Sequence, residues 1–375
     1  MTKRIIVCCD GTWATPDQTA DGQPCPTNVT KLALGIDAVG RNDNGRAVEQ
    51  RVFYHRGVGT GRQDRIGGGA FGAGLSHDVL AAYRYIMGNF QPGDELFLLG
   101  FSRGAYTARS TAGLIRNAGI LRRRFRSRLT EAYALYRDRT PTTNPRSVEA
   151  TLFRRSFSHE TRIHCIAVWD TVGALGIPLT GVPIIDRFNN RWAFHDADLS
   201  TSVDNAFQAL AIDEKRKPFA PALWHQQDGA GSQRLEQVWF TGTHGDVGGG
   251  NRSTSLSDIA LEWIVDRARS CGLVFRPDAF TDIALEQAGD WAPIQESRTG
   301  FWRLLPAYVR PMGTTDPAHE RVSESALKRH EDDPNYRPPN LTRFLENGPP
   351  ARFHSESGPE DTITRSATGP TLSGA

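Results

Sequence analysis

The sequence has 375 residues, 38% of them hydrophobic and 23% charged, and a formal net charge of +2 at pH 7. This length and composition suit a soluble globular protein with a sizeable core, and the near-neutral charge argues against a nucleic-acid partner. The N-terminal apolar run, residues 5–9, is too short for a signal peptide, and no segment approaches the roughly 18 apolar residues of a membrane span. We therefore expect a cytoplasmic protein; any export would use a route that needs no signal peptide.

Four short apolar runs predict the strands of a mostly parallel sheet that is covered on both faces. In chain order they are residues 4–9, 95–99, 163–169 and 237–240. Each run is followed closely by a polar residue that can take part in chemistry, namely Asp10, Ser102, Asp170 and His244. Helical spacing of apolar side chains predicts helices over residues 78–90, 103–115 and 256–268. Alternating strands and helices of this kind predict a doubly wound α/β sheet.

Two stretches are irregular in pattern. Residues 57–74 are rich in glycine but lack the Gly-Lys-Ser/Thr ending of a phosphate-binding loop. We interpret them as a mobile active-site loop or lid, with a plain surface loop as the alternative. Residues 347–375 are rich in Pro, Ser, Thr, Gly and charge, which predicts a disordered tail after a single catalytic domain over residues 1–346. The five cysteines are odd in number and lack metal-like spacing, so we expect buried, reduced thiols.

The motif Gly100-Phe101-Ser102-Arg103-Gly104 directly follows the second apolar run and opens a predicted helix. This strand–turn–helix context is the one that a nucleophile elbow requires. A strained turn exposes the serine there, and Cβ atoms at either glycine would collide with the backbone. The motif therefore predicts Ser102 as the nucleophile of a serine hydrolase with an α/β-hydrolase-like fold and helical insertions. A serine that only caps a helix is the alternative.

A nucleophilic serine needs a histidine base and an orienting carboxylate, which follow in the order Ser, acid, His in this fold class. His244 and Asp170 fit both the order and the placement after a strand. Asp213 and Asp246 are the alternative acids, and we expect Asp246 rather to shape the histidine loop. The predicted triad is therefore Ser102, Asp170 and His244, and its chemistry needs no cofactor and no metal.

Two backbone N–H groups are expected to stabilise the oxyanion that forms when the serine attacks. The first is that of Arg103, because it lies at a helix N-terminus. The second is that of Gly11 or Thr12, which follow the first strand, with Asp10 bracing the turn. An ordinary Asx turn at this place is the alternative.

Two other functions compete with the triad hypothesis. Asp10, Asp170, His244 and Asp246 all lie near strand ends, so they could instead gather a divalent metal ion in a metal-dependent hydrolase. That arrangement leaves Ser102 without a role. A catalytically silent scaffold or interaction protein on a hydrolase fold is the non-enzymatic alternative, and the filled Ser, Asp and His positions argue against it.

The densest basic run extends from Arg122 to Arg128 and contains Phe125. Such a run is usually a solvated face, but it would also attract anionic lipid headgroups, with Phe125 and Leu129 reaching the interface. We therefore keep it as a candidate for peripheral membrane contact. The sequence does not indicate an oligomeric state.

Several of these motifs resemble a bacterial family of uncharacterised α/β-hydrolase domains that includes the catalytic domain of type VI secretion phospholipase effectors. The resemblance covers about residues 4–342 and rests on segments in a fixed order, among them residues 9–13, 100–106, 168–173, 213–216, 239–250 and 336–341. It implies an esterase or lipase, of the phospholipase A type in the secreted members, with the triad on Ser102, Asp170 and His244. The substrate would be a lipid or a small ester. The long additional membrane-associating region of the effectors has no counterpart here, so we expect the catalytic domain almost alone.

Overall fold

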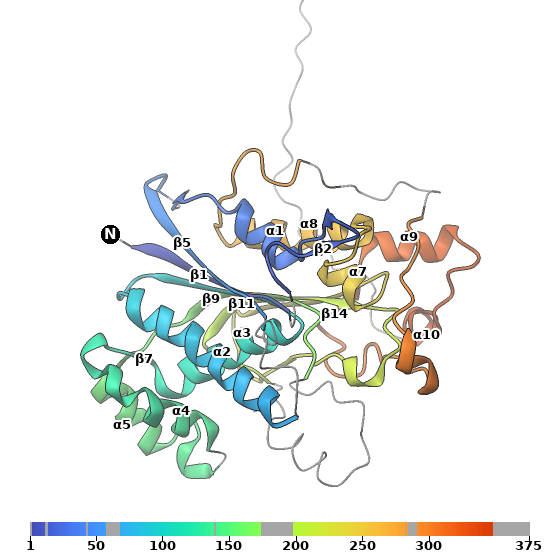
Figure 1. Ribbon diagram of the computed structural model, residues 1–375. Helices are drawn as coiled ribbons and strands as arrows, with labels where there is room; N and C mark the ends of the chain where they lie inside the picture. The colour runs from blue at the N-terminus through green and yellow to red at the C-terminus, as the bar shows by residue number, and fades with distance from the viewer. Residues whose placement is uncertain are drawn as a thin grey trace, which may run out of the picture.

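The computed structural model describes residues 2–11, 14–42, 44–57, 68–138, 140–173, 198–281, 283 and 291–347. Its centre is an eight-stranded sheet in the order β14–β13–β11–β9–β6–β1–β5–β4 (Figure 1). The strands are β1 (Lys3–Cys9), β4 (Val39–Arg41), β5 (Ala47–His55), β6 (Glu95–Phe101), β9 (Ile163–Trp169), β11 (Val203–Ala211), β13 (Arg234–Phe240) and β14 (Glu320–Val322). All neighbours pair in parallel except β4 with β5, so the sheet is mostly parallel with one antiparallel edge strand.

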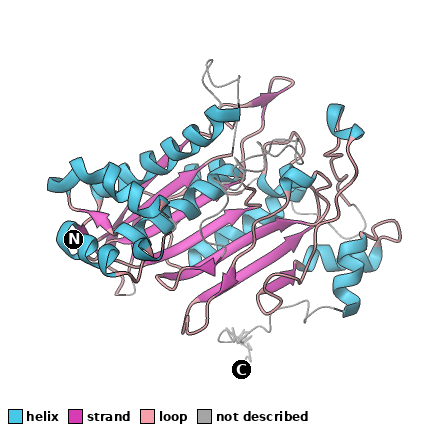
Figure 2. Ribbon diagram, turned by 90° about the horizontal axis from the view of Figure 1, so that it is seen from below, coloured by secondary structure: helices cyan, strands magenta, loops and turns pink. Residues whose placement is uncertain are grey.

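Helices cover both faces of this sheet, which gives three layers (Figure 1). One face carries α2 (Gly68–Asn89), α3 (Arg103–Ala118), α4 (Leu129–Arg137) and α5 (Val148–Phe157). The other face carries α1 (Asn28–Gly35) and α8 (Ser255–Ser270). Seen from below, helices lie over part of the sheet, while several strands are open to view (Figure 2). The arrangement confirms the predicted α/β class.

The remaining elements are short and lie between or beyond these layers. Three two-stranded pairs are β2 (Thr19–Ala20) with β3 (Gln23–Pro24), β7 (Ile120–Leu121) with β8 (Ser158–His159), and β10 (Asp198–Leu199) with β12 (His225–Gln226). The short helices are α7 (His244–Gly248) and the 3₁₀ turns η1 (Arg123–Arg128), η2 (Pro141–Thr143), η3 (Lys217–Phe219) and η4 (Gly300–Leu304). Of these, α7, η3 and η4 border the candidate site described below.

Strand β1 illustrates how the sequence produces the layers. Successive side chains of a strand point to opposite faces. Ile5 and Val7 join the core under α2 and α3, whereas Ile6 and Cys8 join the core under α1 and α8. All four side chains are buried. A parallel sheet covered on both sides requires this continuous apolar run.

A third apolar cluster closes the β14 edge of the sheet. Trp239 of β13 and Val322 of β14 pack there with side chains of α9 (Glu324–Asp332) and α10 (Pro339–Asn347). The Trp239 indole N–H donates to Glu320 at 3.0 Å. Because the chain must reach this edge from η4, it passes the end of β11, where Arg310 donates to the Ala211 carbonyl at 2.8 Å.

The structure confirms the four strands and three helices that the sequence predicts, with shifted bounds at several ends. It adds β5 and β11, in which polar residues interrupt the apolar ones, so that neither strand contains a continuous apolar run. The five cysteines are all buried and free of disulfide bonds. No helix in the described part of the chain combines the length and the apolar character that crossing a bilayer demands.

The prediction of a loop over residues 57–74 is wrong for its second half, because α2 already begins at Gly68. Glycine costs a helix about 1 kcal/mol relative to alanine. Packing of the later turns, with Val79, Tyr83 and Ile86 buried in the core, outweighs this cost. Residues 58–67 lie outside the described residues. So do residues 348–375, on which most of the predicted tail falls, while residue 347 ends α10.

Candidate active site

Ser102 stands on a sharp turn between β6 and α3, at the carboxyl edge of the sheet. Its backbone has φ 58° and ψ −121°, a conformation that costs free energy for any residue other than glycine. The two flanking glycines make the turn feasible. A Cβ atom at Gly100 would lie 2.5 Å from the Gly104 carbonyl oxygen, and one at Gly104 would lie 2.1 Å from that of Cys9. The predicted strand–turn–helix geometry is therefore present.

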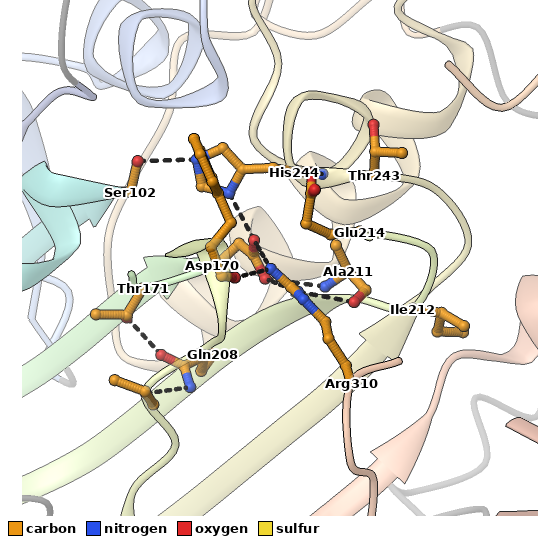
Figure 3. Close-up of polar contacts among 12 residues, drawn as sticks. Ser102, Asp170, Thr171, Gln208, Ala211, Ile212, Glu214, Thr243, His244 and Arg310 are labelled. Atoms are coloured by element: carbon orange, nitrogen blue, oxygen red, sulfur yellow. Dashed lines mark hydrogen bonds and ion pairs between the residues drawn. The ribbon is translucent and has the colours of Figure 1, made fainter. Parts of the chain in front are cut away.

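The structure brings Ser102, His244 and Asp170 into one line of hydrogen bonds (Figure 3). Ser102 Oγ lies 2.8 Å from His244 Nε2, and His244 Nδ1 lies 2.6 Å from Asp170 Oδ2. An ionised carboxylate can only accept, so Nδ1–H donates to Asp170. In the neutral ring Nε2 then carries the lone pair, and it accepts the Ser102 O–H.

Arg310 forms the far end of this line and is fully buried with Asp170 (Figure 3). Its two terminal nitrogens donate to the two oxygens of Asp170, at 2.6 and 2.9 Å, and also to the carbonyls of Ala211 and Phe219. Burial alone would raise the pKa of Asp170. The Arg310 charge and the bonds from His244 and Arg310 outweigh burial and hold that pKa below its ordinary value. Asp170 is therefore a carboxylate at neutral pH.

Asp246 holds the loop that carries His244 through several hydrogen bonds. Asp246 accepts hydrogen bonds from the Thr243 N–H at 3.0 Å and the Thr243 hydroxyl at 2.9 Å, which caps α7. It also accepts from the Gln295 N–H at 3.0 Å and from the Asn251 side chain at 2.9 Å. Its oxygens are thus used within the loop, and Asp170 is the carboxylate that contacts the imidazole.

Glu214 supports the same loop from the opposite side. It accepts the His244 backbone N–H at 3.3 Å and three bonds from Arg216, one from its backbone N–H and two from its side chain, each 2.8 Å long. Burial alone would raise the pKa of Glu214, but the bonds and charge of Arg216 and the neighbouring His244 lower it. Arg216 also lies 3.7 Å over the Phe219 ring, whose centroid is 5.0 Å from that of His244. His244 is therefore held between the Glu214–Arg216 ion pair and the Phe219 ring.

The predicted oxyanion donors have different positions. Arg103 is the first residue of α3, so its backbone N–H lies at the N-terminus of that helix, directly after Ser102. Gly11 lies beside the serine, since a Cβ atom on it would be 3.5 Å from Ser102 Cβ. However, the Gly11 N–H donates to the side chain of Asp10 at 2.6 Å, so the structure does not direct it at the serine. Thr12 lies outside the described residues.

Asp10 accepts hydrogen bonds from several groups around this turn. Its other carboxylate oxygen accepts hydrogen bonds from the hydroxyls of Thr27 at 2.6 Å, Thr30 at 3.0 Å and Tyr54 at 2.6 Å. Burial raises the pKa of Asp10, and these bonds only partly oppose the rise. The residue thus ties β1 to α1 and β5 next to the elbow.

The metal-site alternative is not supported by the positions of its ligands. Asp10, Asp170, His244 and Asp246 do not form a group with ligand atoms close enough to share one ion. Within the described ranges, such a group consists of His55, His77 and Asp78, and these three do not line the cleft at Ser102. The reason is that each of the predicted carboxylates is turned into its own set of hydrogen bonds.

A cleft of about 530 Å³ opens over Ser102 and His244. Its lining includes Arg103, Gly11, Arg216 and Phe219. Residues 295–297 and 299 also line it. The cleft is large enough for part of an ester substrate to reach the serine oxygen.

The basic run proposed for membrane contact forms η1, where Phe125 packs on Phe157 with ring centroids 5.2 Å apart. The Arg128 guanidinium also lies 4.0 Å from the centre of the Phe157 ring. The run follows the C-terminal end of α3, whereas Ser102 precedes its N-terminal end. A helix of 16 residues spans about 24 Å. The run and the serine therefore lie at opposite ends of α3, and the membrane role stays a prediction.

Sequence reasoning missed Arg310, Glu214 and Phe219. Arg310 lies 140 residues after Asp170 in a segment without periodic pattern, so no local signal indicated the contact. Glu214 and Arg216 belong to a segment, residues 213–216, that carried the resemblance, and this was the signal available for them. Phe219 follows in η3 without a motif of its own.

Comparisons with known proteins find a curated relative, similar solved structures and a matching family. "Uncharacterized protein YEL023C" of Saccharomyces cerevisiae is 28% identical in an alignment 239 residues long, and the match covers 58% of this chain and 32% of that protein. The chain thus spans about a third of the length of this curated relative. A solved structure of an uncharacterized protein from Pseudomonas aeruginosa aligns with a TM-score of 0.43 and 17% identity over 73% of this chain and 46% of that one.

A second solved structure, the Tle1 effector bound to the VgrG spike from the Type 6 secretion system, aligns with a TM-score of 0.37 and 19% identity, over 68% of this chain and 52% of that chain. Likenesses this low carry no weight by themselves. The family comparison is different, because its match runs from residue 3 to residue 267, well over half of the chain. The chain therefore belongs to the family described as "T6SS, Phospholipase effector Tle1-like, catalytic domain".

Proposed function

We propose that this chain is a serine esterase of the α/β-hydrolase type that cleaves carboxylic esters, with acyl esters of phospholipids as its substrates. The observation that carries the proposal is the unbroken line of bonds from Arg310 through Asp170 and His244 to Ser102, which ends on a strained elbow in an open cleft. Membership of a phospholipase effector family supports the lipid substrate.

The first half of the reaction forms an acyl-enzyme. Ser102 Oγ attacks the ester carbonyl carbon while His244 Nε2 removes its proton, and Asp170 stabilises the imidazolium through the bond to Nδ1. The negative charge on the carbonyl oxygen faces the Arg103 N–H at the start of α3. When the tetrahedral intermediate collapses, the bond to the alcohol breaks and His244 returns the proton to the leaving oxygen.

The second half repeats these steps with water. His244 removes a proton from a water molecule, which attacks the acyl carbon and releases the fatty acid from Ser102. The serine recovers its proton from His244, so the enzyme ends in its starting state. Each oxyanion donor contributes roughly 3–4 kcal/mol to such a step, by comparison with other serine hydrolases.

The test compares the wild type with Ser102→Ala on two substrates: phospholipid vesicles, with fatty-acid release as the readout, and a soluble short-chain ester. We expect the wild type to cleave both and Ser102→Ala, with unchanged circular dichroism, to cleave neither. Cleavage of the soluble ester alone would contradict the phospholipid substrate. Equal rates for the two proteins would contradict the serine mechanism.

A further inference from the structure

A segment with exposed apolar side chains, residues 300–309, lies beside the cleft, and we refer to it as the apolar ridge. Phe301, Leu304 and Val309 on this ridge are 53%, 80% and 49% exposed. Exposed large hydrophobic side chains number eight in the described residues, and three of them fall within these ten positions. Apolar groups gathered in this way on a surface mark a contact with a partner or a membrane.

The ridge is held in a defined shape. The Arg298 side chain donates to the carbonyls of Trp302 at 3.4 Å, Arg303 at 3.1 Å and Leu305 at 2.5 Å. At the other end, the Tyr308 N–H donates to the Lys215 carbonyl at 2.8 Å. Exposure of the apolar side chains therefore results from the fold of the segment, which presents them outward.

The ridge is continuous with the wall of the cleft. The His244 ring contacts Phe219 with centroids 5.0 Å apart, Phe219 contacts Trp302 at 6.1 Å, and Trp302 contacts the exposed Phe301 at 6.3 Å. Thr299, directly before the ridge, lines the cleft together with Ser102. A ligand that covers the ridge thus also faces the entrance to the serine.

Basic side chains flank the ridge. Lys215, Lys217 and Arg303 are exposed, and Arg216 extends along the same wall, 5.9 Å from the centre of the Trp302 ring. Within the described residues 213–219 and 291–309, the exposed acidic side chain is that of Glu296, which lies 3.7 Å from Lys215. The exposed basic side chains therefore outnumber the exposed acidic one around the apolar ridge. This combination suits the headgroup region of an anionic bilayer, where cations bind headgroups and apolar side chains enter the acyl boundary.

We propose that the apolar ridge docks the protein on the surface of an anionic phospholipid bilayer, with Phe301 and Leu304 inserted and Lys217 and Arg303 against the headgroups. The inference rests on the proposed function, because docking here places the Ser102 cleft against the lipid. Docking through residues 122–128 would instead hold the membrane at the far end of α3.

The test measures binding of the full chain to vesicles by co-sedimentation, in a Ser102→Ala background so that no lipid is consumed. Vesicles of phosphatidylcholine with phosphatidylglycerol are compared with vesicles of phosphatidylcholine alone. The double change Phe301→Ser and Leu304→Ser is expected to weaken binding to the anionic vesicles about tenfold or more, because each removed side chain loses its burial in the interface. The parent protein is expected to bind the anionic vesicles more tightly than the neutral ones.

The matched control carries Val148→Ser and Leu152→Ser on α5, where the side chains are 76% and 58% exposed. It removes two exposed hydrophobic groups away from the cleft and is expected to bind like the parent. Thermal unfolding verifies that each variant is folded. No binding by the parent, or equal binding by the parent and the ridge variant, would overturn the docking proposal. A failure of the esterase function appears separately, as absent ester turnover by the protein that retains Ser102.

Discussion

Asp170 is the most constrained charged residue of the site, because it is shared between His244 and Arg310. A buried carboxylate is costly unless it is paired and hydrogen-bonded. Here the guanidinium neutralises it, and the Ala211 N–H donates a further bond at 3.1 Å. The pair also fixes the direction in which Asp170 faces the imidazole. In the proposed mechanism, Arg310 therefore acts through Asp170, as a positioning residue.

Replacing Arg310 with methionine is expected to lower kcat about 100-fold with little change in KM, since the imidazole loses its fixed support. The acidic limb of the rate–pH profile should also move to higher pH, because Asp170 loses the cation that holds its pKa down. Arg310→Lys keeps the charge and should restore part of both effects. Steady-state kinetics across pH measure the two quantities.

A purely structural role for Arg310 gives a different result. Loss of one partner from a buried ion pair destabilises a protein by roughly 3–5 kcal/mol, so less folded enzyme would be present. In that case the rate would fall by the same factor at every pH, and Arg310→Lys would not shift the profile back. An unmoved acidic limb in Arg310→Met would contradict the positioning role.

Among the elements, the elbow between β6 and α3 depends most on residue size. A Cβ atom at Gly104 would meet backbone atoms of Cys9 and Asp10 at 2.1 and 2.4 Å, and β1 cannot move away without leaving the sheet. Gly104→Ala is expected to lower the free energy of unfolding by about 2–3 kcal/mol or more and to abolish turnover. Chemical denaturation and ester hydrolysis measure these effects.

Gly88 provides the matched glycine for this experiment. It is the second-last residue of α2, and nothing approaches within 4 Å of the position that a Cβ atom would take. Gly88→Ala should therefore leave turnover unchanged and stabilise the chain by about 0.4–1 kcal/mol, because alanine restricts the unfolded chain more than glycine does. Similar losses in both variants would mean that contact with β1 does not explain the role of Gly104.

The elements near the site differ in how well the sequence predicts them. Ser102, Asp170 and His244 each follow a continuous apolar strand, and this pattern alone brings them to one edge of a parallel sheet. Strand β11 escaped prediction because polar residues such as Asn205 and Gln208 interrupt its apolar run, although Gln208 is buried and bonded to Thr171 at 2.5 Å. This strand is stabilised by its pairing with β9 and β13, which are distant in sequence, so a short stretch of sequence does not reveal it.

At the scale of the whole molecule, contacts between distant segments determine what the sequence could not indicate. The segment from η4 to β14 returns to the sheet edge and brings Arg310 to Asp170 across 140 residues. Nothing in its composition marks it as part of the site. The α/β class was predictable from strand–helix alternation, whereas the support of the triad and the apolar ridge depend on how the last third of the chain packs.

Asp213 connects this packing to stability. It accepts hydrogen bonds from the Gly242 N–H at 2.7 Å and the Tyr336 hydroxyl at 3.1 Å, and burial raises its pKa to about 6 from an ordinary 3.8. Because the folded chain holds this proton more tightly than the unfolded chain, stability from this group is complete below pH 3.8 and is lost as pH rises through 6.

Asp213→Asn is therefore expected to stabilise the protein relative to the wild type above pH 6 by on the order of 2–3 kcal/mol, while an amide oxygen can still accept both bonds. Denaturation between pH 4 and pH 8 measures the difference. Asp266→Asn, at an exposed site on α8, controls for the loss of one negative charge. A constant difference between Asp213→Asn and the wild type across this range would show that Asp213 does not titrate in it.

The central claim is that Ser102 is an activated nucleophile, and covalent labelling tests it most directly. The full chain is treated with a fluorophosphonate, and the modified peptide is identified by mass spectrometry, with Ser102→Ala in parallel. We predict one label, on Ser102, which is absent in Ser102→Ala and strongly slowed in His244→Ala. A folded wild type that takes no label, or one that is labelled equally after Ser102→Ala, would contradict the account.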